Sequence, residues 1–178
     1  MMDNTPQPPL QGNNITKDIS QLSVMSYNST GWSVNKADFV STLLLAHSVH
    51  ILALQEHFQL KDNTFKISQC FPGYNTFSIP ASKSNHEIHS GRPSGGIAFL
   101  YSSKISQFVT QLQVPNSSRV QGLKLTFGGS TYVLINTYFP VNTRRFAADE
   151  AALLQTLDDI KFILDSCVPG AVVVLRYE

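Results

Sequence analysis

Polar residues fill the first part of the chain, and short apolar segments separated by polar clusters fill the rest. Residues 1–20 contain Pro6, Pro8 and Pro9 and lack an apolar run, which is typical of a disordered lead-in. Residues 21–178 form the predicted folded domain. Within this domain, short segments rich in β-branched and aromatic residues predict strands. The predicted strands are Leu22–Tyr27, Ile51–Leu54, Tyr74–Ile79, Ile97–Tyr101, Phe108–Val114, Val120–Phe127, Thr131–Thr137 and Ala171–Leu175.

Two longer segments have the apolar spacing of helices. The first is Val34–His47, in which Phe39, Leu43 and His47 fall on one stripe. Asn35 is its predicted N-cap because asparagine side chains accept hydrogen bonds from the first free N–H groups of a helix. The pattern predicts an amphipathic helix between the first two strands.

The second helical segment, Phe146–Ser166, has the strongest periodic pattern in the chain. Leu153, Leu157, Ile160 and Leu164 form an apolar stripe along it. An apolar stripe at this spacing packs on the core of a globular domain. We therefore expect these four side chains to be buried.

The order of the segments indicates an α/β fold. The strand, helix and strand over residues 22–54 have the spacing of a parallel β-α-β crossover. Gly128-Gly129 is a hairpin-turn signal between two later strands. The other strands suit hairpins and meanders. We expect one mixed, mostly antiparallel sheet with both helices on its outer face.

Composition narrows the class of protein. The 178 residues suffice for one domain with a core, 42% are hydrophobic, 14% are charged, and the net charge is +1. So small a net charge means that any nucleic-acid binding must come from a local patch. Cys70 and Cys167 lie far apart and outside any CxxC pattern, which argues against a zinc site or a disulfide framework. We expect no secretory signal and no membrane-spanning segment.

Polar side chains follow three of the predicted strands where each strand ends. Asn28 follows the first strand, Glu56 the second, and Tyr138 the strand over residues 131–137. A glutamate carboxylate suits a hard cation such as Mg²⁺, and a tyrosine hydroxyl can hydrogen-bond a phosphate oxygen. Each residue also has an ordinary alternative: a turn for Asn28, a solvated loop for Glu56 and aromatic packing for Tyr138.

Two basic segments are further candidates for phosphate contact. Arg92 lies in a loop rich in serine, asparagine, histidine and glycine, where its guanidinium can pair with a phosphate. Ser94 and the glycines beside it allow close approach of the backbone. Arg144 precedes the long helix. A flexible loop for Arg92 and a polar lead-in for Arg144 stay open as alternatives.

The order of these clusters resembles the endonuclease/exonuclease/phosphatase superfamily, which has the DNase I-like fold. The matching features are Asn28 after the first strand, Gln55-Glu56 after the crossover, Ser94–Ala98 leading into a strand, and Asn136–Pro140. The sequences of Ser26–Trp32, Leu54–His57 and Gly91–Gly96 are most similar to the endonuclease domain of non-LTR retrotransposons, the reverse transcriptase-associated nucleases. The resemblance covers about residues 22–175.

This resemblance implies a fold, a cofactor and a reaction. The fold is the N-terminal part of a four-layer α/β sandwich, in which two packed sheets have helices outside. The cofactor is Mg²⁺ or Mn²⁺, and the partner is DNA. Asn28 would orient the phosphate and the metal, Glu56 would ligate the metal, and Tyr138 would contact the scissile phosphate. The implied reaction is metal-assisted hydrolysis of a phosphodiester, which nicks one DNA strand.

Four further residues are predicted to bind the substrate. They are Arg92, Ser94, Asn136 and Arg144. If the chain supplies only one of the two sheets, one apolar sheet face is left exposed and becomes a surface for self-association.

The resemblance also has departures at the end of the chain. The family has a Gly-Asp-x-Asn motif after the last strand, whereas Val172–Leu175 is followed here by Arg176-Tyr177-Glu178. The family's later aspartate and its terminal Asp-His pair have no counterpart. We therefore expect a C-terminally truncated domain in which hydrolysis is absent or marginal, because residues that act as a unit do not fail gradually.

Three other functions stay open from the sequence. The chain could bind nucleic acid without cutting it, act as a phosphatase or exonuclease of the same superfamily on a small phosphoester, or complete its sheet with another chain. We expect an intracellular protein, nuclear if it acts on genomic DNA.

Overall fold

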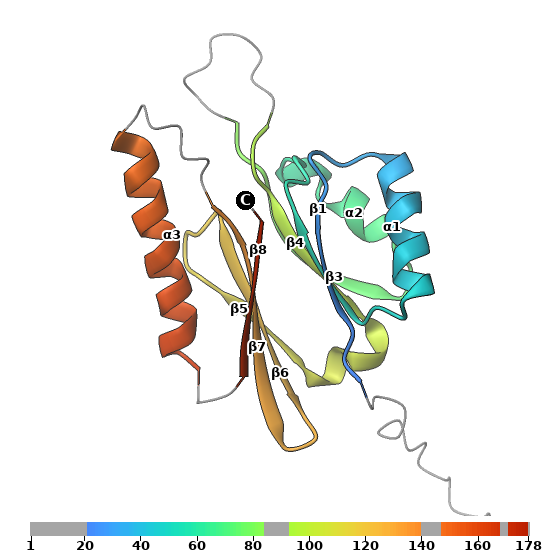
Figure 1. Ribbon diagram of the computed structural model, residues 1–178. Coiled ribbons are helices and arrows are strands. Elements are labelled where there is room, and N and C mark those ends of the chain that lie inside the picture. Colours follow the sequence, from blue (N-terminus) through green and yellow to red (C-terminus); the bar gives the residue numbers. More distant parts are fainter. Residues whose placement is uncertain (1–20, 84–92, 140–146, 168–170, 178) are drawn as a thin grey trace, which may run out of the picture.

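The computed structural model describes residues 21–83, 93–139, 147–167 and 171–177 and has two sheets with helices on either side (Figure 1). The predicted lead-in over residues 1–20 lies outside this description.

Every predicted strand is present, with ends within two residues of the prediction, and both predicted helices are confirmed. The structure adds a short helix, α2, and two 3₁₀ helices at Lys61–Asn63 and Ser103–Phe108. In chain order the elements are β1 (Val24–Asn28), α1 (Val34–Ala46), β2 (Ile51–Gln55), α2 (Phe65–Gln69), β3 (Tyr74–Ile79), β4 (Ile97–Ser102), β5 (Val109–Gln113), β6 (Val120–Phe127), β7 (Ser130–Tyr138), α3 (Ala147–Asp165) and β8 (Ala171–Tyr177).

Each sheet has four strands and combines a parallel pair with antiparallel pairs. The first sheet has the order β1-β2-β4-β3, and β1 and β2 are parallel, which confirms the predicted crossover through α1. The second has the order β5-β6-β7-β8, and β7 and β8 are parallel around α3. The Gly128-Gly129 hairpin between β6 and β7 is confirmed. Both glycines have positive φ, +59° and +78°, as a two-residue hairpin turn requires.

The two sheets pack face to face and share one apolar layer. Ile51 and Phe99 from the first sheet meet Leu123 and Leu134 from the second, and all four side chains are buried. Helices α1 and α2 cover the outer face of the first sheet, and α3 covers the outer face of the second (Figure 1). The α/β class is confirmed, but the expectation of one sheet with helices on one face is wrong.

The layer between the sheets also removes the exposed sheet face that was predicted for self-association. Strand β2 shows why, since all five of its residues are buried. Alternate residues of β2 serve both sides: Ile51 and Ala53 face the second sheet, while Leu52 and Leu54 face the helices. This is the near-continuous apolar pattern of a central strand.

Helix α1 packs with a different stripe from the one predicted. Its buried residues are Ala37, Val40 and Leu44, whereas Phe39 is 53% exposed. The N-cap is Ser33, whose hydroxyl accepts from the backbone N–H of Lys36, and not Asn35. The reason is that apolar residues occur on more than one side of this helix, so spacing alone does not select the packed face.

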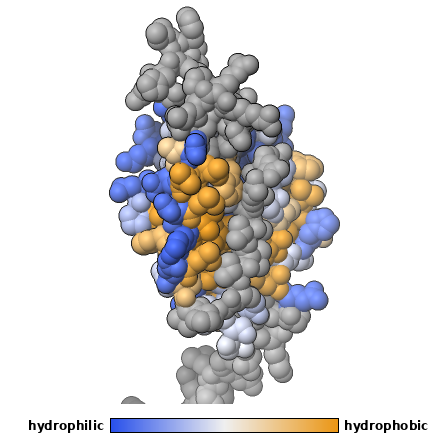
Figure 2. Space-filling model, turned by 60° about the vertical axis from the view of Figure 1, so that its left-hand side comes forward, coloured by the Kyte–Doolittle hydropathy of each residue, from blue (hydrophilic) through white to orange (hydrophobic). Residues whose placement is uncertain are grey.

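Helix α3 shows the same discrepancy. Ile163 is buried and Ile160 packs partly against the second sheet, but Leu153, Leu157 and Leu164 are 38%, 47% and 40% exposed. Figure 2, which brings the α3 side of the molecule forward, shows apolar side chains gathered on the surface.

Within the described ranges, no helix is both long and apolar enough to cross a membrane.

A buried amide joins the two sheets beneath the ends of β2 and β7. The Nδ2 group of Asn136 donates to the backbone oxygens of Leu54 (3.1 Å) and Ala98 (3.0 Å) in the first sheet. Its Oδ1 atom accepts from Gln55 Nε2 at 2.8 Å. Asn136 and Gln55 are completely buried. Because buried polar groups are costly when unpaired, these bonds fix how the sheets lie on each other.

We predict that Asn136→Ala lowers the free energy of unfolding by about 3 kcal/mol, because it removes three buried hydrogen bonds between the two sheets. Thr137→Val is the matched control. Thr137 is equally buried, and its hydroxyl has no hydrogen-bond partner among the described residues. Urea unfolding should place Thr137→Val within about 0.5 kcal/mol of the wild type or above it. Equal losses in the two variants would contradict the role given to Asn136.

Candidate functional site

The candidate site lies where strands from both sheets end. Because β1 and β2 are parallel, their carboxyl ends meet at one edge, and Asn28 pairs in register with Gln55. Glu56 follows directly. Tyr138 ends β7 in the second sheet, and the Glu56 carboxylate contributes to raising the pKa of its phenol. The structure therefore places Asn28 and Glu56 at one edge of the first sheet and Tyr138 at the end of β7, and their predicted roles stay predictions.

Glu56 occupies a left-handed backbone conformation, with φ of +51°. Its carbonyl oxygen accepts from the backbone N–H of Gly31 (2.6 Å) and from Ser29 Oγ (3.0 Å). These bonds tie the loop after β1 to the end of β2 and offset a conformation that is unfavourable for a residue with a side chain. The Glu56 side chain is partly exposed, so its carboxylate stays accessible to a ligand.

Of the two polar side-chain atoms of Asn28, one is hydrogen-bonded and the other has no partner among the described residues. Its Oδ1 atom accepts from the backbone N–H of Thr30 at 2.8 Å, which forms a local turn. Its Nδ2 atom is buried and lacks a hydrogen-bond partner in the part of the chain that the structure describes. An unpaired buried donor at a site suits a ligand oxygen, such as that of a phosphate.

Lys36 holds the loop that follows Asn28. From the first turn of α1, its ammonium donates to the backbone oxygens of Ser29, Thr30 (3.2 Å) and Gly31 (2.9 Å). Three carbonyl oxygens converging on one ammonium satisfy its three donors. This contact, which no sequence motif indicated, fixes the loop between Asn28 and α1.

A cation and an anion both act on Tyr138. The Arg119 guanidinium stands 5.4 Å from the centre of the Tyr138 ring, and the Tyr138 N–H donates to the Arg119 carbonyl at 3.0 Å. Burial raises the pKa of Tyr138 above its ordinary value of 10.0, the Glu56 carboxylate raises this pKa further, and Arg119 lowers it. At neutral pH the phenol is therefore protonated and able to donate a hydrogen bond.

Arg119 is a candidate site residue that the sequence did not reveal. It precedes β6 in a short polar turn that has no recognisable motif. Only its contact with the Tyr138 ring identifies it as a candidate site residue. It also lines a small pocket with Tyr138 and Ser94. The other lining residues are Pro80, Ser82, Gly95, Gly96 and Ser118.

Ser94 lines the same small pocket as Tyr138, but its described contacts are structural, and its predicted contact with substrate stays a prediction. Its backbone N–H and C=O pair with Ser82 at 3.0 Å and 3.2 Å. A Cβ atom on the neighbouring Gly95 would lie 3.5 Å from the Tyr138 ring, so the glycine allows this close approach. Arg92 and Arg144 lie outside the described residues, and their predicted contacts stay predictions.

The predicted substrate contact of Asn136 is corrected by the structure. The side chain is fully buried, and both of its polar atoms bind Gln55, Leu54 and Ala98. In this arrangement it cannot reach a ligand. Asn136 therefore has a structural role. The sequence does not reveal this role, because it depends on contacts with the other sheet.

His57, next to Glu56, is a core residue. Its ring is fully buried, Nδ1 accepts from the backbone N–H of Gln59 (3.0 Å), and Nε2 lies 3.1 Å from the Ile79 oxygen. Burial lowers the pKa of His57 from 6.5 to about 4, against the smaller opposing effects of backbone hydrogen bonds. A Cβ atom on Gly96, whose φ is +82°, would lie only 2.5 Å from this ring. His57 is therefore a neutral packing group.

The donor set fits a Mg²⁺ ion held by few protein atoms. Among the described residues, no group of three or more His, Cys, Asp and Glu side chains could hold a metal, and Cys70 and Cys167 are free thiols. Mg²⁺ is commonly bound by one or two carboxylates, waters and substrate phosphates. Glu56 suits this role. Because Asn28 Oδ1 already binds Thr30, its remaining donor suits a phosphate better than a cation.

The fold has close relatives among solved structures, although no family model and no curated protein matches the chain. One relative is the AP endonuclease LMAP of Leishmania major (TM-score 0.64, 16% identity), over 87% of this chain and 54% of that chain. Another is the APE2 catalytic domain of Xenopus laevis (0.58, 16%), over 85% and 57%. A third is the 3′ phosphatase NExo of Neisseria bound to a product DNA hairpin (0.57, 17%), over 88% and 57%.

These likenesses define the class of fold. Identities of this size show the fold alone, and the fold is the DNase I-like one that the motif order predicted. The chain spans little more than half the length of these structures. Truncated TDP2 of Caenorhabditis elegans has the same fold at 22% identity and a TM-score of 0.52.

We predict that the buried ring of His57 makes the fold sensitive to mild acid. Its pKa lies below that of the unfolded chain, so its contribution is complete above about pH 6.5 and is lost as the pH falls toward 4. The loss amounts to about 3 kcal/mol at the lower end. Urea unfolding at a series of pH values measures it. His57→Gln should flatten the profile, and His47→Gln, at an exposed histidine, should leave it unchanged; the same slope in all three proteins would contradict this prediction.

Proposed function

We propose that this chain binds the phosphodiester backbone of DNA together with a divalent cation at the site formed by Asn28, Glu56, Tyr138 and Arg119. The observation that carries the proposal is the arrangement around Tyr138, a protonated phenol with the Arg119 guanidinium over its ring and with a pKa that the Glu56 carboxylate raises. Glu56 would hold the cation, and the Tyr138 hydroxyl and the Arg119 guanidinium would donate to the phosphate.

Each residue has a distinct role in this proposal. Glu56 holds Mg²⁺, and the ion would supply charge stabilisation at the phosphate. The buried Nδ2 group of Asn28 donates to a phosphate oxygen and thereby gains the partner that it lacks among the described residues. Tyr138 donates through its hydroxyl. Arg119 contributes positive charge from the second sheet.

In this proposal the chain hydrolyses DNA marginally or not at all. General-base catalysis needs a side chain that takes a proton from water, and the described histidines are not placed for it. His57 is buried, while His50 accepts from the Ser23 backbone beside the start of β2, away from the site. The same proposal includes an origin in a retrotransposon endonuclease, which the sequences of the motifs suggest.

Nicking of supercoiled plasmid with Mg²⁺ tests the catalytic part. We expect the wild type, Glu56→Gln and an EDTA control to show the same background, since none of the described histidines is placed to act as the base. Retained folding is checked by circular dichroism. Nicking by the wild type that disappears both in Glu56→Gln and with EDTA would show an active enzyme and overturn the proposed inactivity, while supporting the metal site.

DNA binding tests the other part. We expect Arg119→Gln to weaken binding of a labelled duplex by about tenfold and to reduce the slope of log affinity against log salt, because one phosphate contact is lost. Lys104→Gln removes the same charge from an exposed position in the 3₁₀ helix before β5 and should leave affinity within about twofold. Fluorescence anisotropy measures both. Equal effects would show that only net charge matters and would contradict the proposed site.

A further inference from the structure

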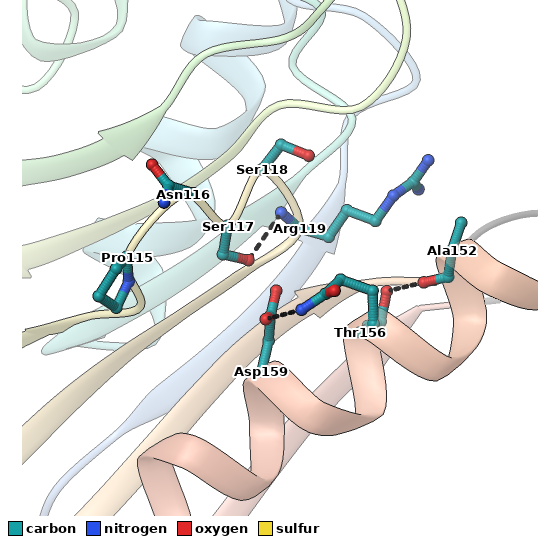
Figure 3. A pocket seen from close by; sticks show the side chains of 9 residues that line it. Pro115, Asn116, Ser117, Ser118, Arg119, Ala152, Thr156 and Asp159 are labelled. Atoms are coloured by element: carbon teal, nitrogen blue, oxygen red, sulfur yellow. Dashed lines mark hydrogen bonds between the residues drawn. The ribbon is translucent and has the colours of Figure 1, made fainter.

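A second and larger pocket, of about 450 Å³, lies between α3 and the turn that joins β5 to β6 (Figure 3). Its lining residues are Pro115, Asn116, Ser117, Ser118 and Arg119 from the turn and Ala152, Gln155, Thr156 and Asp159 from the helix. Ser118 and Arg119 also line the small pocket at Tyr138. The two pockets are therefore neighbours that share one wall.

Asp159 gives this pocket a buried carboxylate. Its side chain is 7% exposed and is directed from α3 toward the turn (Figure 3). Among the described residues it accepts one hydrogen bond, at 2.8 Å from Gln155 Nε2, and has no cationic partner. A buried carboxylate needs more donors than one amide supplies. The free capacity of Asp159 favours a ligand that donates hydrogen bonds.

The opposite wall of the pocket is preformed. Ser117 Oγ accepts from the backbone N–H groups of Arg119 (3.3 Å) and Val120 (3.1 Å), and Asn116 has φ of +60°. On the helix, the Thr156 hydroxyl donates to the Ala152 carbonyl at 2.7 Å and does not compete for Asp159. The pocket thus keeps a fixed shape with one strong acceptor, which is typical of a small-molecule subsite.

Arg119 connects this pocket to the phosphate site. Its guanidinium lies over the Tyr138 ring, and its side chain points away from Asp159 in Figure 3. A strand whose phosphate lies at Tyr138 would pass Arg119 and place an adjacent nucleotide at the pocket. The volume of about 450 Å³ suits one nucleoside.

We propose that this pocket holds a nucleobase with an exocyclic amino group, with Asp159 accepting from that group. Acidic side chains read cytosine through its N4 amino group, and thymine presents an oxygen at the same position. The proposal rests on the proposed function, because the phosphate at Tyr138 brings the base to the pocket. The proposed pocket would give the protein a base preference, which contacts with phosphate alone do not provide.

Binding of short labelled oligo-dC and oligo-dT at pH 7.5 with Mg²⁺ tests this proposal by anisotropy. We expect the wild type to bind oligo-dC about tenfold more tightly than oligo-dT. Asp159→Asn should abolish most of this preference. Asp158→Asn is the matched control, since it removes the same charge from an exposed neighbour on α3 and should preserve the preference. Ala152→Leu, which narrows the pocket without altering Asp159, provides a second test should Asp159→Asn not fold.

The outcomes separate the two proposals. Equal affinity of the wild type for both oligonucleotides, or a preference that survives Asp159→Asn and Ala152→Leu, would overturn the base pocket. If binding without base preference still depended on Arg119, the phosphate site would stand without the base pocket. Absence of binding to either oligonucleotide would contradict both.

Discussion

The hydrogen bonds of Asn136 are the interaction on which the arrangement of the site depends. Each sheet alone places only part of the candidate site: Asn28 and Glu56 come from the first sheet, Tyr138 from the second. Apolar contacts between the sheets tolerate sliding, since they are non-directional. A buried amide with fixed donors and acceptors does not, because a displacement leaves polar groups unpaired. The position of Tyr138 relative to Glu56 therefore follows from a bond in the core.

The site itself is assembled mainly by backbone. The positive φ of Glu56, the carbonyl oxygens gathered on Lys36 and the short turn at Asn28 all fix loops at strand ends. Unfavourable conformations of this kind persist only where the surroundings impose them, and they gather at binding sites. The charged groups are few. Arg119 and Glu56 act in opposite directions on the pKa of a single phenol, so both signs of charge meet at the site although the net charge of the chain is +1.

The strands could be predicted from sequence, whereas the packed faces of the helices could not. Strand positions, the crossover and the hairpin follow from local signals such as β-branched residues and Gly128-Gly129. In both helices apolar residues lie on several sides, and the choice of Ala37 over Phe39, or of Ile163 over Leu157, depends on the sheet beneath. The number of sheets is likewise a non-local property, because the sequence of a strand does not determine which other strand it pairs with.

The same distinction applies to the site. Glu56 and Tyr138 could be found because strand ends are where loops carry function, but Arg119 has no motif. Asn136 has the position of a substrate contact in the sequence, whereas its side chain pairs with Gln55 in the core. This pairing has a consequence for evolution. A change at either amide alone removes a buried hydrogen bond between the two sheets, so the two positions are expected to co-vary among sequences with this fold, even though 81 positions separate them along the chain.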